Sequence, residues 1–380
     1  MELLALVFRN QRARPVRSLL TVLGILVATA SMVLFLSFGE GLRQALAGEM
    51  TKFGPEIRVV AEGTGVFGVP NPELDQNVLD TLKAHARELG IARLFPAVVM
   101  MKGSGFDPAT TFLFYGLPEG VTPKDLAPAA KLVAGRLDPH PDGAVVGKQK
   151  AEQNRLTLGK VLRLSRRAEV PVVGIVDAGN GLADSFIFVP MKLLQKVLHT
   201  DQYSVVLVYV APGHKADEVA ARIRALLPGV DAQTTSEAIK YAERAIKIGD
   251  VIRFGISLIA LIVGGLLVAN TVMMSVYERI REFGVMRAIG ARRGFIFRLV
   301  LLEALLLAVA GGAVGVAAGY LGSWVVNLYT THAVGLALSA VTPRLVLFSL
   351  AVALALGLSA GLLPARVASR ISVVEALGRL

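Results

Sequence analysis

Three local patterns contain residue types that could do chemistry. The stretch "GAVVGK" (143–148) resembles a phosphate loop, but that motif needs four residues between its glycines and a Ser or Thr after the lysine, and here there are three residues and Gln149. Ser104 in "GSG" lacks the flanks of a nucleophile elbow. The histidines, at positions 85, 140, 199, 214 and 332, have no paired spacing that suits a metal. We therefore predict no catalytic residue, no metal ligand and no cofactor bound directly.

The densest charge lies in "YERIREFGVMRAIGARR" (277–293), which holds seven charged side chains between two long uncharged runs. Its apolar residues do not form one stripe on a helical wheel, so it is not a single amphipathic helix resting on lipid. We expect the preceding span to extend to about Phe283, a short transverse helix over 285–289, and a turn at Gly290. Such an elbow would offer Met286, Arg287 and Ile289 to a protein surface. The alternative is an ordinary turn whose arginines only hold the topology.

The composition requires that these residues be placed by membrane helices. Hydrophobic residues make up 54% of the 380-residue chain and charged residues only 18%, which is too apolar for an ordinary soluble protein. A helix needs about 20 apolar residues to cross the hydrocarbon of a bilayer. Four uncharged stretches are long enough: Ser18 to Gly39, Phe254 to Val276, Ala304 to Tyr329 and Leu345 to Leu363.

The distribution of charge predicts the topology. Of the net charge of +11, residues 1–18 carry +3, residues 277–298 carry +4 and residues 364–380 carry +2, whereas residues 39–253 carry only +2. Basic segments beside membrane spans stay on the cytoplasmic side. Both termini and the charged link are therefore expected inside, with residues 40–250 outside. Because no basic patch is left for a folded domain, nucleic acid is not an expected partner.

The N-terminal region allows two interpretations. Residues 2–13 put Leu3, Leu6 and Val7 on one helical face, which predicts a short amphipathic helix on the inner leaflet, with a disordered basic tail as the alternative. The four arginines before the first run could also begin a signal peptide, cleaved near Ala45 to Ala47. The run is longer than the 7–15 residues of a signal-peptide core, which favours a retained span.

The external region shows strand-like runs alternating with helical patterns. The predicted strands are residues 56–62, 91–100, 110–117, 168–176, 184–191 and 203–210. The predicted helices are residues 75–89, 144–155 and 215–227, and residues 63–73 form a loop. We expect a mixed α/β domain with two subdomains divided near residues 118–135. The chain has no cysteine, so this domain must be held by its own core.

Small residues recur in the last two spans. Gly311, Gly315 and Gly319 are four apart, as are Gly357 and Gly361, so each helix has a flat stripe that another backbone can approach. Contacts within the chain and contacts between two copies explain this spacing equally well. The spans carry almost no ionisable groups, which argues against ion conduction through them. The cytoplasmic segments are too short to fold as an ATPase, so any driver inside the cell must be another chain.

A resemblance to a known family adds to these inferences. The stretch "VYERIREFGVMRAIGARRGFIFRLVLLEALLLAVAGGAVGVAAGYLG" (276–322) resembles the signature of the FtsX-like, MacB-type ABC transporter permeases, which include LolC and LolE. Residues 9–46 are similar to the first span of that family, "VPVVGIVDAG" (170–179) to its extracytoplasmic domain, and "LPARVASRISVVEAL" (363–377) to its tail. The resemblance covers nearly the whole chain and is weakest at 60–130.

The resemblance implies a permease that dimerises and binds a separate ATPase, because the chain begins at the permease without the fused ATPase domain of MacB. It also implies that the link between the second and third spans is a coupling helix seated in the ATPase, and that helix movement drives the external domain. By position, that role falls on Arg281, Glu282, Phe283, Gly284, Val285, Met286, Arg287, Ala288, Ile289, Gly290 and Ala291. ATP and magnesium would be bound by the partner.

The expected fold is therefore membrane α-helical, with four transmembrane helices, plus a large mixed α/β extracytoplasmic domain. The expected division is a cytoplasmic N-terminal segment (1–17), transmembrane helix 1 (18–39), a MacB-like extracytoplasmic domain (40–250), transmembrane helix 2 (251–276), a coupling segment (277–298), transmembrane helix 3 (299–329), an external loop (330–344), transmembrane helix 4 (345–363) and a cytoplasmic tail (364–380).

The leading hypothesis is a non-catalytic permease subunit in the bacterial inner membrane. It would couple ATP hydrolysis by a cytosolic ABC ATPase to export or extraction of a substrate, with a second permease copy, identical or not, and a periplasmic adaptor or membrane-fusion protein as further partners. The alternative is an FtsX-like signalling subunit that activates an extracytoplasmic hydrolase. A membrane-anchored enzyme is a third class, and it lacks a catalytic cluster in the sequence.

Overall fold

The computed structural model describes residues 15–50, 52, 54–103, 110–166, 168–179, 181 and 183–373. The amphipathic helix expected at residues 2–13, Ser104 and the end of the tail (374–380) lie outside this part. The chain divides into two compact units. The helical unit contains the chain up to Leu42, Lys247–Asn327 and the chain from Leu338 onward, and the sheet unit contains Arg43–Ile246 and Leu328–Ala337.

Within the described residues, four helices are long and apolar enough to cross a membrane. They are α2 (Pro15–Met50), α8 (Thr235–Glu278), α10 (Arg293–Val334) and α11 (Pro343–Arg370). Each contains one of the four uncharged stretches. Together with the mixed sheet of the other unit, they confirm the predicted fold class.

The helices are longer than the apolar runs they contain. α8 begins at Thr235, before the predicted start of the second span at residue 251, and α2 continues to Met50, beyond residue 39. A helix satisfies its backbone hydrogen bonds internally, so it can leave the hydrocarbon without changing structure. The loss of apolar residues therefore marks where a span ends, but not where its helix ends.

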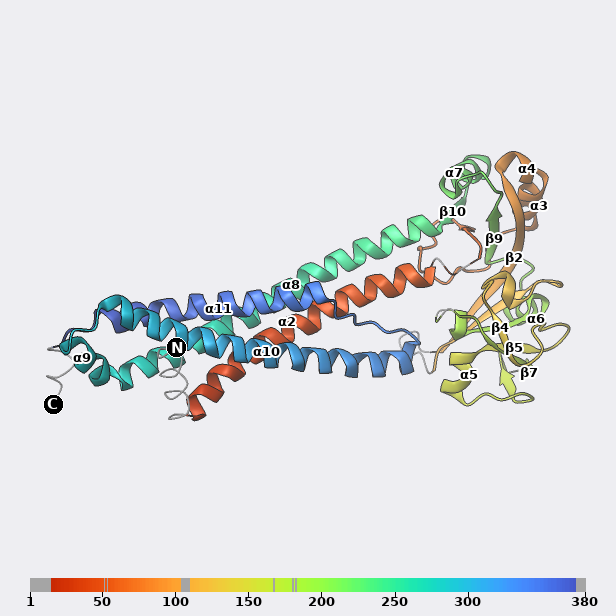
Figure 1. Ribbon diagram of the computed structural model, residues 1–380. Helices are drawn as coiled ribbons and strands as arrows, with labels where there is room; N and C mark the ends of the chain where they lie inside the picture. Colours follow the sequence, from red (N-terminus) through yellow and green to blue (C-terminus); the bar gives the residue numbers. More distant parts are fainter. Residues whose placement is uncertain are drawn as a thin grey trace. The chain divides into compact units, whose positions relative to one another are not determined.

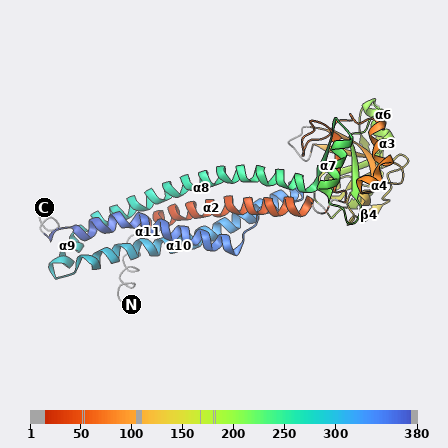
Figure 2. The same ribbon diagram turned by 90° about the horizontal axis from the view of Figure 1, so that it is seen from above.

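The core of the helical unit is built from small and branched residues of all four long helices. A short helix, α9 (Ile280–Ala288), adds its Phe283 to this core at the end of the unit where α8 ends and α10 begins (Figure 1 and Figure 2). The buried cluster contains Ile25, Val268, Val272, Val276, Phe283, Ile296, Leu299, Val300, Ala304, Ala308, Ala353, Ala360, Ala365, Ala368 and Ile371.

The described strands of the sheet unit form one sheet in the order β10-β1-β9-β2-β3-β8-β5-β7-β4, with β6 paired to β7. Their bounds are β1 (Ile57–Ala61), β2 (Ile91–Lys102), β3 (Phe112–Leu117), β4 (Lys131–Gly135), β5 (Ala144–Gly147), β6 (Val161–Arg163), β7 (Glu169–Asp177), β8 (Phe186–Pro190), β9 (Val205–Val210) and β10 (Val230–Thr234). Five helices accompany them: α3 (Gln76–Ala84), α4 (Ala86–Leu89), α5 (Lys148–Asn154), α6 (Met191–Leu198) and α7 (Ala216–Leu226).

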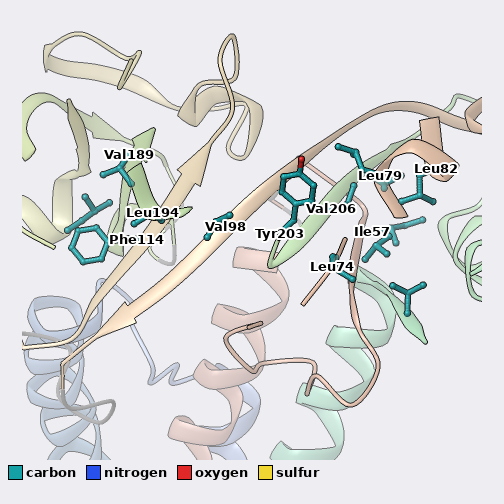
Figure 3. Packing of buried hydrophobic residues seen from close by; sticks show 14 of the residues in the cluster. Ile57, Leu74, Leu79, Leu82, Val98, Phe114, Val189, Leu194, Tyr203 and Val206 are labelled. Atoms are coloured by element: carbon teal, nitrogen blue, oxygen red, sulfur yellow. The ribbon is translucent and has the colours of Figure 1, made fainter. Parts of the chain in front are cut away.

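The two faces of this sheet are covered differently. One face packs on helices α3 to α7, and its buried side chains form a continuous cluster along the sheet, from Ile57 and Leu82 past Val98 to Phe114 (Figure 3). The other face packs on loop residues such as Val121, Leu126 and Ala183. Successive side chains of a strand point to opposite faces of the sheet, so each strand can contribute to the packing on both faces. The sheet unit is therefore a two-layer α/β structure with loops on its second face.

Six strands and the helical pattern at 215–227 match the predictions from the sequence, but residues 144–155 were predicted wrongly as one helix. Residues 144–147 are strand β5, and only the part from Lys148 is helical. Strand β5 pairs with both β7 and β8, so neighbouring strands decide the structure of a run too short to be assigned by its own period. Strands β4, β6 and β10 and helix α6 were not predicted from the sequence.

The division of the sheet differs from the one expected at residues 118–135. Strand β2 pairs with β9 through residues 91–97 and with β3 through residues 98–102, so both halves of the sheet share this one long strand. The strands on either side of 118–135, β3 and β4, belong to the same half. Proline and glycine at 118–135 mark a loop, whereas the two halves join inside a strand that has no such signal.

Candidate functional site

The charged segment between α8 and α10 forms a helix with defined ends. α8 ends at Glu278, Arg279 leaves helical geometry with φ −105° and ψ 15°, and α9 follows from Ile280 to Ala288. At its end Gly290 has φ 99°, a left-handed conformation that glycine adopts without strain. The N–H of Gly290 donates to the carbonyl of Arg287 (3.1 Å) and the N–H of Ala291 to that of Met286 (2.9 Å), a Schellman motif.

The start of α9 is fixed by a buried cation. Arg279 is only 5% exposed, and its Nε donates to Glu282 Oε2 at 2.9 Å and its Nη1 to Glu303 Oε2 at 3.1 Å. Glu303 lies in α10, so the pair ties the junction of α8 and α9 to the next long helix. The guanidinium carbon also lies 5.1 Å from the centre of the Phe283 ring. Helix α9 is therefore held at its start by the hydrogen bonds of Arg279 and at its end by the Schellman motif at Gly290.

The break between helices lies earlier than the sequence predicted. We expected the second span to continue to about Phe283, but the non-helical residue is Arg279, and Gly284 lies inside α9. Phe283 is 1% exposed and Met286 packs against the core cluster of the helical unit. Met286 is half-buried and Val285 is more exposed, so contact of Met286 with a protein surface stays a prediction.

The outward side of α9 combines apolar and charged residues. Val285 is 50% exposed and Ile289, four residues later and next to it on the surface, is 81% exposed. Arg281, Glu282 and Ala288 are also exposed, whereas Arg287 and Ala291 are half-buried and Gly284 is buried. An exposed apolar pair with charges around it has the composition of a small protein-binding surface.

The glycine stripes lie against helices of the same chain. A Cβ on Gly311 would lie 2.7 Å from Ile25 Cβ, one on Gly315 2.8 Å from Thr29 Cβ, and one on Gly319 2.6 Å from Val33 Cβ, so the stripe of α10 faces α2. Gly357 and Gly361 of α11 approach Ala308 and Ala304 of α10 in the same way. Of the two explanations that the spacing allowed, the structure realises close packing within one chain.

The phosphate-loop-like stretch at 143–148 also owes its glycines to packing. A Cβ on Gly143 would lie 2.3 Å from Val173 Cγ2, and one on Gly147 2.3 Å from the carbonyl oxygen of Asp184. Lys148 is paired with Asp177 at 3.2 Å. Burial alone would raise the pKa of Asp177, but the N–H of Gly179 and the Lys148 ammonium lower it below its usual value.

Sequence reasoning missed Arg279 and Glu303 as the anchor of the segment. Both were visible as charges at the edges of apolar runs, and a charge that must be buried needs a partner. Their distance of 24 positions along the chain left the pairing unspecified, because it depends on how α8 and α10 pack.

Comparisons with known proteins agree with this architecture. Residues 18–226 match the model of the MacB-like periplasmic core domain, and residues 254–373 match that of the FtsX-like permease C-terminal region. The first match covers nearly all of α2 and most of the sheet unit, and the second covers the later part of α8 together with α9, α10 and α11.

Relatives cover nearly all of the chain. The macrolide export ATP-binding/permease protein MacB of Neisseria gonorrhoeae is 27% identical over 97% of this chain and 59% of its own length. The pyoverdine export ATP-binding/permease protein PvdT of Pseudomonas fluorescens is 28% identical over 95% of this chain and 57% of its own. The chain therefore spans about three fifths of the length of the curated relatives it matches.

Two solved structures are similar to part of the chain. The periplasmic region of MacB from Actinobacillus actinomycetemcomitans aligns with 52% of this chain and 97% of its own at 16% identity, with a TM-score of 0.37. The extracellular domain of YknZ from Gram-positive bacteria aligns with 47% of this chain and 99% of its own at 17% identity, with a TM-score of 0.33. On the family matches over residues 18–226 and 254–373, the chain belongs to the MacB/FtsX-type family of ABC transporter permeases.

Proposed function

We propose that this chain is the non-catalytic membrane subunit of an exporter, and that α9 is the surface through which an ABC ATPase drives it. The observation that carries the proposal is the exposed pair Val285 and Ile289 on a short helix fixed at both ends. A surface that must transmit movement has to be rigid in itself and apolar enough to bind. The relatives named above are described as ATP-binding/permease proteins, which supports an ATPase as the partner.

The ATPase would bind ATP and magnesium, and the expectation that it is a separate cytosolic chain belongs to this proposal. Residues 281–291 would seat in it, with Val285 and Ile289 buried in the interface and Arg281 and Glu282 at its rim. α8 begins directly after strand β10 and ends one residue before α9, so one continuous helix leads from the sheet unit to the proposed coupling surface. Movement of α9 would in this way reach the sheet unit without a flexible linker.

The positive-inside charge pattern supports an inner-membrane protein with cytoplasmic termini and an extracytoplasmic sheet unit. A second permease copy and a periplasmic adaptor are proposed on the same family basis. Export or extraction is favoured over activation of a hydrolase because residues 18–226 match the domain of named exporters. The substrate would be a molecule already outside the inner leaflet.

The test is purification of the tagged full-length chain from its own cells, with co-purified proteins identified by mass spectrometry. An ABC ATPase is expected with the unaltered chain and is expected to be lost from a variant with both Val285→Glu and Ile289→Glu. The matched control is Val161→Glu, an equally exposed valine of strand β6. Retention of the ATPase by the double variant, at unchanged membrane level, would refute the coupling surface.

A further inference from the structure

The sheet unit contains a cavity of about 300 Å³ on the face of the sheet opposite helices α3 to α7, where Leu46 of α2 and Ala238 of α8 also line it. Its floor is formed by strand residues, and the loop residues Val66 to Pro70 lie across it. Small-molecule sites in proteins have volumes of roughly 300–1,000 Å³. Most of the side chains that line the cavity are apolar, among them Leu46, Phe67, Val99, Leu113 and Leu207.

One end of this cavity is polar, because two paired strands place an arginine beside a glutamine. Arg58 of β1 is directly opposite Gln233 of β10 in the antiparallel ladder, and both line the cavity. Arg58 Nη1 donates to the carbonyl of Val66 at 3.3 Å. Gln233 is 4% exposed, and its Nε2 donates to the carbonyl of Thr64 at 2.7 Å and to Asp231 Oδ2 at 3.1 Å.

These two side chains also have buried atoms that no described residue satisfies. Arg58 Nε and Gln233 Oε1 are buried and have no hydrogen-bond partner within the described part of the chain. Leaving a buried polar atom unpaired destabilises the fold, and a charged group does so more than a neutral one. Arg58 and Gln233 therefore place a cation and a buried amide, each with unused hydrogen-bonding capacity, in the wall of an apolar cavity.

The other polar groups that line the cavity form no ion pair with Arg58 within the described part of the chain. Glu56 lines the cavity as well, but its Oε2 accepts the N–H of Val210 at 3.0 Å, and among the described residues no carboxylate forms an ion pair with Arg58. Burial raises the pKa of the Tyr115 phenol, and the nearby Arg58 charge only partly offsets this, so Tyr115 stays neutral at physiological pH. A guanidinium in apolar surroundings favours an anion as its partner.

We propose that this cavity binds an anionic amphiphile. Its apolar body would fill the space between the sheet and residues 66–70, and its carboxylate or similar group would accept hydrogen bonds from the Arg58 guanidinium. Phe67 and Val69 are exposed at the rim and provide an apolar entrance. The inference goes beyond the proposed function, because binding here requires neither an ATPase nor the coupling surface.

The test uses the full-length chain in lipid nanodiscs and a tryptophan placed at the cavity. The chain has one tryptophan, Trp324, so a variant with Trp324→Phe and Phe67→Trp reports from the rim alone. Titration with 11-bromoundecanoate, whose bromine quenches on contact, is expected to give saturable quenching. 11-Bromoundecanol has the same chain without the charge and is expected to bind about tenfold more weakly, since a charge-assisted hydrogen bond is lost.

Two further variants in the reporter background test the assigned residues. Arg58→Gln is expected to weaken binding of the acid about tenfold, whereas Arg87→Gln, an exposed arginine on the helical face, should leave it unchanged. Leu113→Phe narrows the cavity without altering charge and should weaken acid and alcohol alike. Circular dichroism checks that each variant folds. If Arg58→Gln does not fold, the proposal is decided by the difference in affinity between the acid and the alcohol and by the effect of Leu113→Phe. Absent or unsaturable quenching, equal affinity for acid and alcohol, or equal behaviour of the two arginine variants would overturn the proposal.

Discussion

The guanidinium of Arg279 and the carboxylate of Glu303 form a buried ion pair, with 3.1 Å between Nη1 and Oε2 and side chains 6% and 13% exposed. The pair joins the α8–α9 junction to α10. Because the proposed coupling surface begins one residue later, its position depends on this pair.

Replacing one member of this pair should destabilise the helical unit strongly. Arg279→Gln breaks the buried ion pair with Glu303, and breaking a buried pair costs roughly 3–5 kcal/mol. Thermal unfolding in detergent should show a clearly lower Tm. Glu282→Gln removes the half-exposed partner, worth roughly 0–1 kcal/mol, and is the matched control. The double variant with Arg279→Met and Glu303→Leu should recover part of the lost thermal stability, because it leaves no charge buried at this position. Equal Tm values for Arg279→Gln and Glu282→Gln would contradict the role of Arg279 as an anchor.

Gly315 should be intolerant of even one added methyl group. In Gly315→Ala the new Cβ would lie 2.8 Å from Thr29 Cβ and 3.0 Å from the carbonyl oxygen of Leu26. Both distances are shorter than van der Waals contact, so α10 must move away from α2. Overpacking of this kind costs roughly 1–3 kcal/mol. Gly255→Ala in α8 is the control, because nothing lies within 4 Å of its added Cβ, and alanine is the better helix former. Detergent Tm values should fall for the first and stay or rise for the second, and the reverse order would show that the stripe is not packed as described.

Asn327 should hold the segment before α11 in place. Its Nδ2 donates to the carbonyl of Ser339 at 2.7 Å, and its Oδ1 accepts the N–H of Ser339 at 2.8 Å. Asn327→Ala leaves two backbone groups without partners, at roughly 1–3 kcal/mol each if they stay buried. Hydrogen–deuterium exchange should accelerate at residues 338–341. Ser359→Ala, which removes only a bond from a side chain to its own helix, is expected to leave this segment protected.

Asp184 should make the sheet unit less stable at neutral pH than in mild acid. Burial raises the pKa of Asp184 from 3.8 to about 6, with Asp177 adding to the rise and the N–H of Ala178 opposing it. The cost of ionising Asp184 in the fold is absent below pH 3.8 and complete above about pH 6, because the unfolded carboxyl ionises freely between these values. Asp184→Asn keeps the acceptor for Ala178 and should raise Tm at pH 7.5.

The gain from Asp184→Asn should shrink towards zero as the pH falls to 4, and thermal unfolding across this range measures it. Asp177→Asn is the contrast, since the pKa of Asp177 is lowered and its ionised form is favoured by the fold. That variant should lower Tm at pH 7.5. A gain for Asp184→Asn that is equally large at pH 4 would contradict the assigned pKa.

Much of the architecture follows from local properties of the sequence. Apolar length located the four spans, and runs of β-branched and aromatic residues bounded by Gly, Pro and Asp located six strands. The element order then agreed with the family resemblance, which the matches over residues 18–226 and 254–373 confirm. Each of these signals lies within one segment, so no knowledge of neighbours is needed. Where pairing with neighbouring strands decides the secondary structure, as for residues 144–147 between β7 and β8, the prediction from the local sequence was wrong.

By itself, the sequence determined which segments are apolar enough to span a bilayer and that a charged, glycine-containing link separates the second from the third. Tertiary structure alone decided that Val285 is more exposed than Met286 on that link, that Gly315 faces Thr29, and that Arg58 pairs with Gln233 beside a cavity. The reason is physical: composition and periodicity act over a few residues, whereas the direction of a side chain depends on helix phase and strand register, which packing between distant segments fixes.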